Sequence, residues 1–247
     1  MKRDEITKEG EAMSYSTVSV KQACVITHVA FEDLGTLEQY LQNFGYEILY
    51  LQAGVDCLKN LIVSPPPLLI ILGGPISVYD SHNYPFLEDE SNIIKSRIQH
   101  NLETIGICLG AQLIAYSLGS KIYPGNKEIG WYRVSNTSPG KEDFFDCFTK
   151  DPVFHWHGDT FDLPRGAVLK LKSHLCAHQA FTYGEKILAL QFHPEITLKN
   201  LERWLIGHAF ELSKEKINII NLRRQAELYI PQLAEASAKF WTSWFTK

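Results

Sequence analysis

Cys108 is the residue whose type and setting most favour chemistry. It stands between the apolar run ETIGI at 103–107, which predicts a buried strand, and LGAQLIAYSLG at 109–119, which predicts a helix with Gly119 at its C-terminal end. A thiol at the start of a helix gains from the helix dipole, which favours the nucleophilic thiolate. The alternative is a buried structural cysteine. Small glycine neighbours on both sides favour the reactive interpretation, because they let the backbone turn tightly.

A second candidate lies where the run ILALQF ends, in the tripeptide His193-Pro194-Glu195. A strand carries His193 to its end, and proline stops further strand pairing, which fixes the direction in which Glu195 leaves. A carboxylate this close suits a histidine whose second ring nitrogen must be oriented for nucleophilic catalysis. By itself the tripeptide fits a capped turn equally well. Together with a reactive cysteine elsewhere in the chain, it favours a triad of Cys108, His193 and Glu195.

The glycine pair of GGP at 73–75 follows another apolar run, LLIIL at 68–72. In an open α/β sheet, ligands bind at the carboxyl ends of the strands, so this loop and Cys108 belong to the same edge. If the two strands are neighbours, the backbone N–H groups of Gly74 and Leu109 both face the oxyanion that develops in a reaction at the thiol. The alternative is a simple turn, which is all that a Gly-Gly-Pro sequence indicates alone.

The segment HWHGD at 155–159 offers a rival chemistry, a metal site, because alternation along a strand places both histidines and the aspartate on one face. A zinc hydrolase needs a third or fourth ligand, and His174 and His178 are the nearby donors. The sequence contains no second cluster of donors, so we expect no metal. The structural interpretation has Asp159 capping a turn and Trp156 in the core.

Short apolar runs alternate with helical segments through the first half of the chain, and these elements must position the candidate residues. Strands are predicted at ACVITHV, YEILYL, LLIIL and ETIGI, with helices at 34–44, 89–101 and 109–119. Continuous apolar runs indicate parallel strands buried on both faces, since parallel strands need crossover helices. We therefore expect a doubly wound, mainly parallel α/β sheet.

The rest of the chain shows two other patterns. From Lys121 to Gln191 short alternating segments are punctuated by glycine, proline and aspartate, and we expect antiparallel strands added to the sheet edge. Beyond Glu211 apolar residues recur every three or four positions, which predicts a helix that Pro231 interrupts or restarts. Its apolar face is expected to pack on the same domain, and a homodimer interface is the alternative. The predicted units are a loose tail at 1–20, one domain at 21–212 and a helical extension at 213–247.

Composition and charge exclude several classes of protein. With 45% hydrophobic and 21% charged residues over 247 positions, the chain has the apolar content of a folded domain. Its formal charge of -4 and the lack of a basic run argue against nucleic acid as a partner. The apolar runs are too short to cross a bilayer and the charged N-terminus is unlike a signal peptide, so we expect a cytoplasmic protein. Five widely spaced cysteines without a CxxC pair fit a reducing compartment.

Three of these motifs resemble the signatures of class I glutamine amidotransferases and occur in the same order: LGGP at 72–75, GICLGAQ at 106–112 and FHPE at 192–195. The resemblance covers 21–211. HWHGDTFDLP at 155–164 is similar to stand-alone relatives of the glutaminase half of GMP synthase. What the resemblance implies is a flavodoxin-like fold, no cofactor, and hydrolysis of the side-chain amide of glutamine through a γ-glutamyl thioester.

The resemblance also implies a role for each residue of the site. Cys108 would attack the amide carbon, His193 would act as base and then as acid, and Glu195 would orient the imidazole. The N–H groups of Gly74 and Leu109 would hold the oxyanion. The residues that would frame the glutamine are Gly73, Gln112, His157, Gly158 and Asp159.

Amidotransferases that make a named product pair such a glutaminase with a synthetase, and residues 21–211 are taken up by the glutaminase alone. One expectation is therefore that ammonia passes to a separate synthetase partner. A second is that the same triad hydrolyses a γ-glutamyl peptide. A third is a non-catalytic binding protein of the same fold, which the intact triad disfavours.

Overall fold

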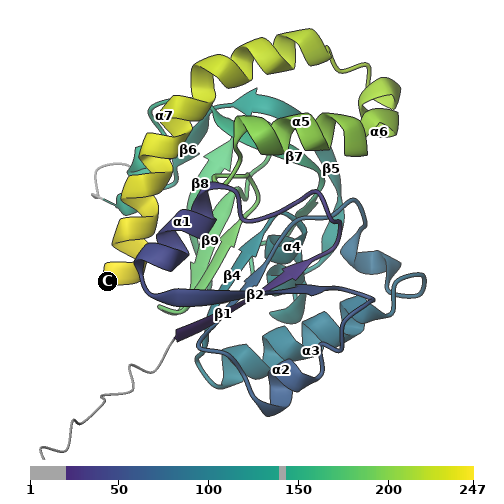
Figure 1. Ribbon diagram of the computed structural model, residues 1–247, viewed down its shortest axis with the longest axis vertical. Coiled ribbons are helices and arrows are strands. Elements are labelled where there is room, and N and C mark those ends of the chain that lie inside the picture. The colour runs from purple at the N-terminus through teal and green to yellow at the C-terminus, as the bar shows by residue number, and fades with distance from the viewer. Residues whose placement is uncertain (1–20, 139–142) are drawn as a thin grey trace, which may run out of the picture.

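The computed structural model describes residues 21–138 and 143–247 and is built around a twisted sheet of eight strands (Figure 1). The strand order is β2-β1-β3-β4-β10-β9-β8-β6. In that order, the strands span Tyr46–Gln52, Lys21–Thr27, Leu68–Ile71, Glu103–Ile107, Ile187–Leu190, Ala180–Tyr183, Val168–Ser173 and Val134–Asn136. The first five strands run parallel, and each of the last three is antiparallel to its neighbours. The predicted doubly wound, mainly parallel α/β fold is confirmed.

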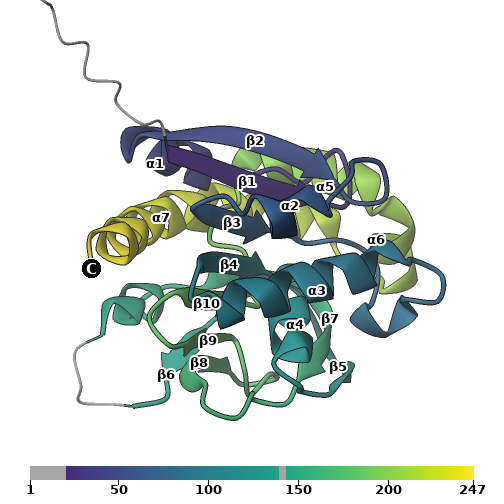
Figure 2. The same cartoon turned by 90° about the horizontal axis from the view of Figure 1, so that it is seen from below.

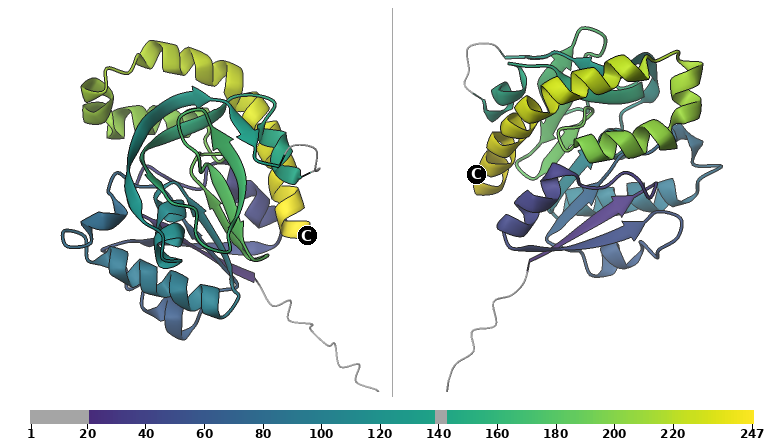
Figure 3. Two further views of the ribbon diagram at one scale, coloured as in Figure 1. Left: turned by 180° about the vertical axis from the view of Figure 1, so that it is seen from behind. Right: turned by 45° about the horizontal axis from the view of Figure 1, so that its top comes forward.

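Helices cover both faces of the sheet, because successive side chains of a buried strand point to opposite faces. The helices are α1 (Thr36–Asn43), α2 (Asn60–Val63), α3 (Phe86–Gln99), α4 (Leu109–Ser117), α5 (Leu198–Gly207), α6 (Ala209–Lys214) and α7 (Ile219–Thr246). Val25 and Ile70 belong to the core beneath α1, α5 and α7, whereas Ile26 and Ile71 belong to the core beneath α2, α3 and α4. Figures 2 and 3 show these two groups of helices on opposite sides of the sheet.

Three strands between Lys121 and Gln191 are placed differently from the prediction of edge strands. β5 (Ile122–Tyr132) and β7 (Val153–Phe161) form a separate antiparallel ribbon, and β10 lies inside the main sheet between β4 and β9. The reason for β10 is its composition: all four residues of ILAL are buried, which suits an interior strand. β6, β8 and β9 do extend the sheet edge with antiparallel strands, as expected.

The C-terminal helical region is confirmed, but the predicted interruption at Pro231 is wrong. α7 continues through Pro231 and curves over the sheet in Figure 1. Proline removes one helical hydrogen bond, yet Ile230 and Leu233 on either side of it are buried, so packing holds both halves in one helix. Helical structure also begins earlier than expected, at Leu198 in α5.

α7 contacts α1, β5 and the short 3-10 helix η2 (Phe144–Phe148), which places it on the body that contains the sheet. The division of the chain at 212 stays a prediction, and the tail predicted at 1–20 lies outside the described residues. Within the ranges that the structure describes, no helix is both long and apolar enough to cross a membrane.

Candidate active site

Cys108 occupies a strained turn between β4 and α4. Its φ of 54° and ψ of -107° are uncommon for a residue other than glycine. The turn is fixed because the Cys108 N–H donates to the carbonyl of Leu190 on β10 at 2.8 Å. A Cβ on Gly106 would overlap the backbone of Gly110, and one on Gly110 would overlap the carbonyl of Ile71. The flanking glycines therefore let the chain turn within a closely packed sheet edge, where the thiol meets the start of α4.

His193 reaches the same place from the end of β10. Its N–H donates to the carbonyl of Phe154 on β7 at 2.8 Å, and its Nδ1 donates to Oε1 of Glu195 at 2.7 Å. Both side chains are buried, and Nε2 lies toward the Cys108 sulfur without a hydrogen bond to another described residue. Burial alone would lower the pKa of His193, but the charge of Glu195 and the nearby sulfur raise it well above its ordinary value.

The loop after β3 brings Gly73 against these two side chains. A Cβ on Gly73 would lie 3.3 Å from Cε1 of His193, 3.5 Å from Cβ of Cys108 and 2.6 Å from Oε2 of Glu32. No larger residue fits there without moving the Glu32 carboxylate. The Gly73 carbonyl is anchored by a hydrogen bond of 2.8 Å with Nδ1 of His28.

Two backbone N–H groups lie next to the thiol. Leu109 is the first residue of α4, so its N–H has no acceptor within the helix. Gly74 lines the same cavity as Cys108, and its N–H donates to no other group in the described parts of the chain. The structure thus brings both predicted oxyanion donors to the predicted nucleophile.

The residues expected to frame glutamine come from α4 and the end of β7. Nε2 of Gln112 donates to the carbonyl of Asp159 at 3.4 Å and to Oε1 of Gln191 at 3.2 Å, which ties α4 to β7. The Asp159 carboxylate accepts hydrogen bonds from Ser77 at 2.6 Å and from Tyr79 at 3.2 Å, at the start of the 3-10 helix η1 (Val78–Asp80). Asp159 therefore closes the cavity against this loop and does not cap a turn.

A single cavity of about 550 Å³ joins these groups. Its titratable wall residues are Glu32, Tyr79, Cys108, Lys127, His157, Asp159, His193, His208, Glu211 and Lys214. Gly158 and Trp156 also line it, and the Trp156 indole N–H donates to Glu211 at 3.0 Å, so this tryptophan belongs to the cavity wall as well as to the core. The Trp156 carbonyl accepts a hydrogen bond from the Cys108 thiol at 3.5 Å.

Comparisons with known proteins identify the family of this chain. Residues 34–211 match the family described as glutamine amidotransferase class-I. The chain belongs to this family. It is 28% identical over 224 residues to the glutamine amidotransferase-like protein YfeJ of Salmonella typhimurium, a match that covers 87% of this chain and 92% of YfeJ.

Other relatives of this class I amidotransferase are longer proteins. It is 32% identical to the GMP synthase of Brachyspira hyodysenteriae, but it spans only 32% of that protein while 67% of this chain is matched. A solved glutamine amidotransferase from Thermotoga maritima superposes with a TM-score of 0.80 at 34% identity, covering 92% of this chain and 99% of that one. A glutamine amidotransferase from Methylobacillus Flagellatus shares the fold, with a TM-score of 0.81 at 24% identity and coverage of 92% and 95%.

This class I amidotransferase also buries a polar cluster of Glu128, His155 and His157, of which His157 lines the cavity. One donor atom from each lies within 4.8 Å of the others. The third member comes from β5, where Glu128 pairs with His157 on β7, so the expectation of His174 or His178 as the additional donor is wrong. Asp159 does not join the two histidines.

Hydrogen bonds already occupy the Glu128 carboxylate. Oε1 accepts from Ser173 at 2.7 Å, and Oε2 accepts from Gln179 at 2.6 Å and lies 3.1 Å from Nε2 of His157. Burial alone would raise the pKa of Glu128, but the hydrogen bond with His157 and the one with Ser173 lower it. The other ring nitrogen of His157 lies 3.2 Å from the carbonyl of Asp159. This arrangement supports the backbone at 157–159 and favours a structural network over a metal site.

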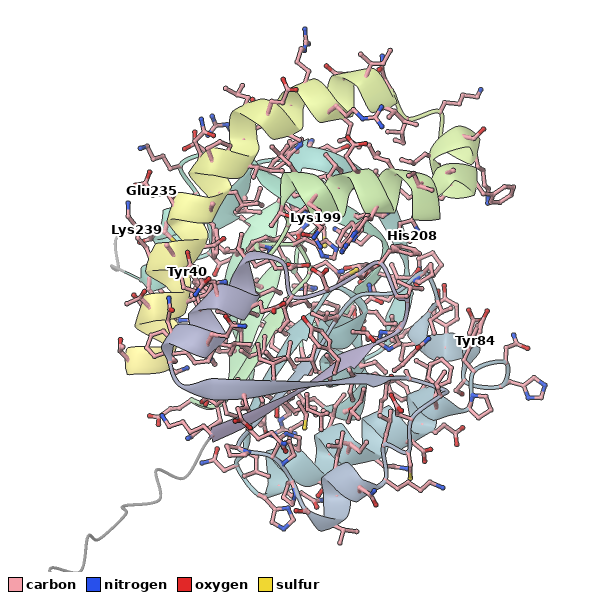
Figure 4. The ribbon with its side chains drawn as sticks, in the orientation of Figure 1. Tyr40, Tyr84, Lys199, His208, Glu235 and Lys239 are labelled. Carbon is pink, nitrogen blue, oxygen red and sulfur yellow. The ribbon has the colours of Figure 1, made fainter. Side chains whose placement is uncertain are left out.

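Two residues of the cavity wall were missed by the sequence analysis. Oε1 of Glu32 lies 3.2 Å from Nε2 of His208, and both side chains are buried. Glu32 follows β1, whereas His208 lies where α5 ends and α6 begins (Figure 4). The two positions are 176 residues apart, so no local motif signals their pairing.

The C-terminal helix also reaches the site, which the sequence did not indicate. Ser237 on α7 is fully buried and donates to the carbonyl of Pro194 at 2.7 Å. The carbonyl of the next residue, Glu195, accepts from the N–H of Thr36 at the start of α1 at 2.8 Å. Two helices therefore fix the backbone between His193 and Glu195.

Proposed function

We propose that this protein hydrolyses the side-chain amide of glutamine through a γ-glutamyl thioester on Cys108. The observation that carries the proposal is the convergence of three features on one cavity: a thiol in a strained turn, an imidazole nitrogen free to exchange a proton, and two N–H groups without acceptors. These are the parts needed for acyl transfer to a cysteine. Membership of the class I family supports the choice of glutamine.

The first half of the reaction forms the thioester. Cys108 Sγ attacks the amide carbon of glutamine as its proton passes to Nε2 of His193. The carbonyl oxygen becomes an oxyanion, which the N–H groups of Gly74 and Leu109 stabilise. When the tetrahedral intermediate collapses, the C–N bond breaks and His193 gives its proton to the leaving nitrogen, so that ammonia departs.

The second half releases glutamate. A water molecule gives a proton to His193 as its oxygen attacks the thioester carbon, and the same two N–H groups hold the second oxyanion. Collapse breaks the C–S bond, and the Cys108 sulfur regains its proton. Glu195 accepts the hydrogen bond from Nδ1 of His193 and keeps that nitrogen in its donor role, so that Nε2 carries the exchange in both halves. Gln112 and the backbone at 157–159 frame the rest of the substrate.

The fate of the ammonia is the second part of the proposal. The GMP synthases that resemble this chain are about three times its matched length, and this chain matches one third of them. A separate synthetase chain that receives the ammonia is therefore the partner that this function calls for, and a homodimer is compatible with it.

A γ-glutamyl peptide is the second candidate substrate, and the size of the cavity favours it. At about 550 Å³ the cavity is within the range of roughly 300–1,000 Å³ that holds drug-sized ligands. It extends past His193 to His208, Glu211 and Lys214. These side chains give room and polar contacts for a leaving group larger than ammonia, while the chemistry at Cys108 is unchanged.

Cys108→Ser tests both candidates with one variant. Purified wild-type protein should release glutamate from glutamine or from a γ-glutamyl dipeptide, and the serine variant should lose at least about 10³-fold of that rate because the hydroxyl is a weaker nucleophile. Cys57→Ser is the matched control, since Cys57 is exposed and lies outside the cavity. The ratio of the two substrates' kcat/KM values identifies the preferred leaving group.

A glutamine-like diazoketone provides an independent readout of the nucleophile. Peptide mass spectrometry should find the adduct on Cys108 and not on Cys57, although Cys57 is the more exposed thiol. A serine variant with most of the wild-type rate, or an adduct distributed over several cysteines, would show that the assignment is wrong.

A further inference from the structure

His28 lies behind the Gly73–Gly74 loop, outside the cavity, with hydrogen-bond partners on both ring nitrogens. Nδ1 lies 2.8 Å from the Gly73 carbonyl oxygen, and Nε2 lies 3.1 Å and 3.3 Å from the two carboxylate oxygens of Glu90 on α3. The two side chains are 2% and 0% exposed. The pair is therefore sealed from solvent directly beneath the loop that carries a predicted oxyanion donor.

The partners of His28 determine the charge of its ring. The Gly73 carbonyl only accepts hydrogen bonds, so Nδ1 carries a proton, and when the Glu90 carboxylate is the acceptor at Nε2 that nitrogen carries one as well, which makes the ring an imidazolium. Burial alone would lower the pKa of His28, but the hydrogen bond and charge of Glu90, the Gly73 carbonyl and the charge of Glu32 raise it. The aromatic ring of Phe86 also lies near His28, and it adds no charge to this environment.

The Gly73–Gly74 peptide connects this cation to the reaction. The described chain contains no cis peptide bond, so in this planar unit the Gly73 C=O and the Gly74 N–H point in opposite directions. With the carbonyl directed at His28, the N–H is directed away from it, and Gly74 lines the cavity beside Cys108. A charged donor on the carbonyl polarises the whole peptide and strengthens the hydrogen bond that its N–H can donate.

We propose that His28 and Glu90 are positioning residues of the oxyanion hole, which hold an imidazolium against the Gly73 carbonyl so that the Gly74 N–H binds the oxyanion more strongly. The inference rests on the proposed glutamine hydrolysis. Stability alone does not explain the pair, because the desolvation of a buried ion pair offsets much of its attraction. A Gly74 N–H that stabilises negative charge in the transition state gives the pair a role in the rate.

Kinetics of Glu90→Gln and His28→Asn test the inference, because each variant removes the charge and keeps a donor near the Gly73 carbonyl. We expect kcat for glutamine to fall about tenfold with KM unchanged, less than the roughly 10²–10³-fold loss from removing an oxyanion donor. His28→Ala, which also removes the donor, should lose more. Alkylation of Cys108 by iodoacetamide needs the thiolate but no oxyanion, so its rate should stay within about twofold. Glu88→Gln, an exposed change on the same helix, is the matched control.

The charge itself is measured by ¹⁵N NMR of histidine-labelled protein, with the His28 signals assigned by their loss in His28→Asn. Two protonated ring nitrogens at pH 7.5 are expected, and a neutral ring overturns the inference whatever the activity. A merely structural role would lower the melting temperature or change the alkylation rate and KM while kcat per labelled active site stayed constant. If Cys108→Ser abolishes activity but Glu90→Gln and His28→Asn keep the wild-type kcat, this inference is wrong and the proposed function stands.

Discussion

His193 and His28 are both buried next to a glutamate, and they differ in what the second ring nitrogen does. In the His193–Glu195 pair Nδ1 is bound and Nε2 is left without a hydrogen bond to any described residue. In the His28–Glu90 pair both nitrogens are bound, one by the carboxylate and one by the Gly73 carbonyl. The glutamate raises the pKa of both histidines against the effect of burial.

The difference teaches that the same residue pair can serve two physical roles near one thiol. A ring with one free nitrogen can accept a proton and return it, because the partner on the other nitrogen holds its orientation. A ring with two bound nitrogens cannot exchange a proton without breaking a hydrogen bond, so it acts as a fixed charge. The first kind of ring lies beside the thiol in the cavity, and the second lies outside the cavity, behind the Gly73–Gly74 loop.

His155 completes the series, because neither of its ring nitrogens hydrogen-bonds to a described residue. It is fully buried beside His157. Burial lowers its pKa to about 3 even though the charge of Glu128 acts in the opposite direction. The three histidines thus differ in how many ring nitrogens are hydrogen-bonded. His28 has two and acts as a fixed cation, His193 has one and can carry a proton, and His155 has none and is neutral.

Glu195→Gln should have the largest effect among the pair variants. The amide keeps the shape of the carboxylate but removes the charge that raises the pKa of His193 and holds Nδ1 as a donor. We expect kcat for glutamate release to fall about 10²–10⁴-fold with little change in KM. The pKa of His193 should fall, and alkylation of Cys108 by iodoacetamide should slow near neutral pH. A loss no larger than that of Glu90→Gln would show that the two pairs do not differ as described.

Ser237→Ala tests whether α7 helps to keep the His193–Glu195 pair in place. The variant leaves the buried carbonyl of Pro194 without this donor, which costs about 1–3 kcal/mol. We expect the melting temperature to fall by about 2–4 °C for each kcal/mol, and kcat to fall severalfold because the backbone between the two side chains loosens. Both are measured on the same preparation.

Lys239→Ala is the control for that variant, because it changes the same helix at an exposed ion pair with Glu235 (Figure 4). Solvent and salt screen such a pair, so neither the melting temperature nor kcat should change measurably. If Ser237→Ala behaves like this control, α7 has no part in holding the pair.

Sequence reasoning located the groups that belong to a local motif and missed the pairs whose members carry no motif. Glu195 lies two positions from His193, so a tripeptide signals the contact, and the Cys108 turn is signalled by the glycines around it. His28 and Glu90 are 62 positions apart, and their meeting depends on how α3 packs against the sheet.

The fold shows the same limit. The parallel strands and the helices that alternate with them could be predicted, because continuous apolar runs indicate strands buried on both faces. The separate ribbon of β5 and β7 could not be predicted in this way, since an alternating run fits an edge strand and a separate ribbon equally well. The continuation of α7 through Pro231 depends on tertiary packing, which overrides the local preference of proline.

His155→Phe should leave the rate almost unchanged, and it should make the stability of the protein depend less on pH. The folded protein keeps His155 neutral down to a pH of about 3, whereas the unfolded chain takes up its proton near 6.5. As the pH falls from 6.5 toward 3, the unfolded state therefore binds more protons, and wild-type stability falls. Phenylalanine has no such proton, so the melting temperature of the variant should fall less steeply over this range.

Melting curves between pH 7 and 4 measure that slope, and His100→Phe is the control because His100 is exposed. The kcat of His155→Phe should stay near the wild-type value at pH 7.5, since no step of the proposed hydrolysis uses this ring. Two results together would contradict this: kcat falling as far as in Glu195→Gln, and a melting temperature that depends on pH as in the wild type. They would show that His155 binds a ligand. The buried cluster with Glu128 and His157 would then have to be treated as a metal site, and addition of Zn²⁺ or a chelator should change the rate.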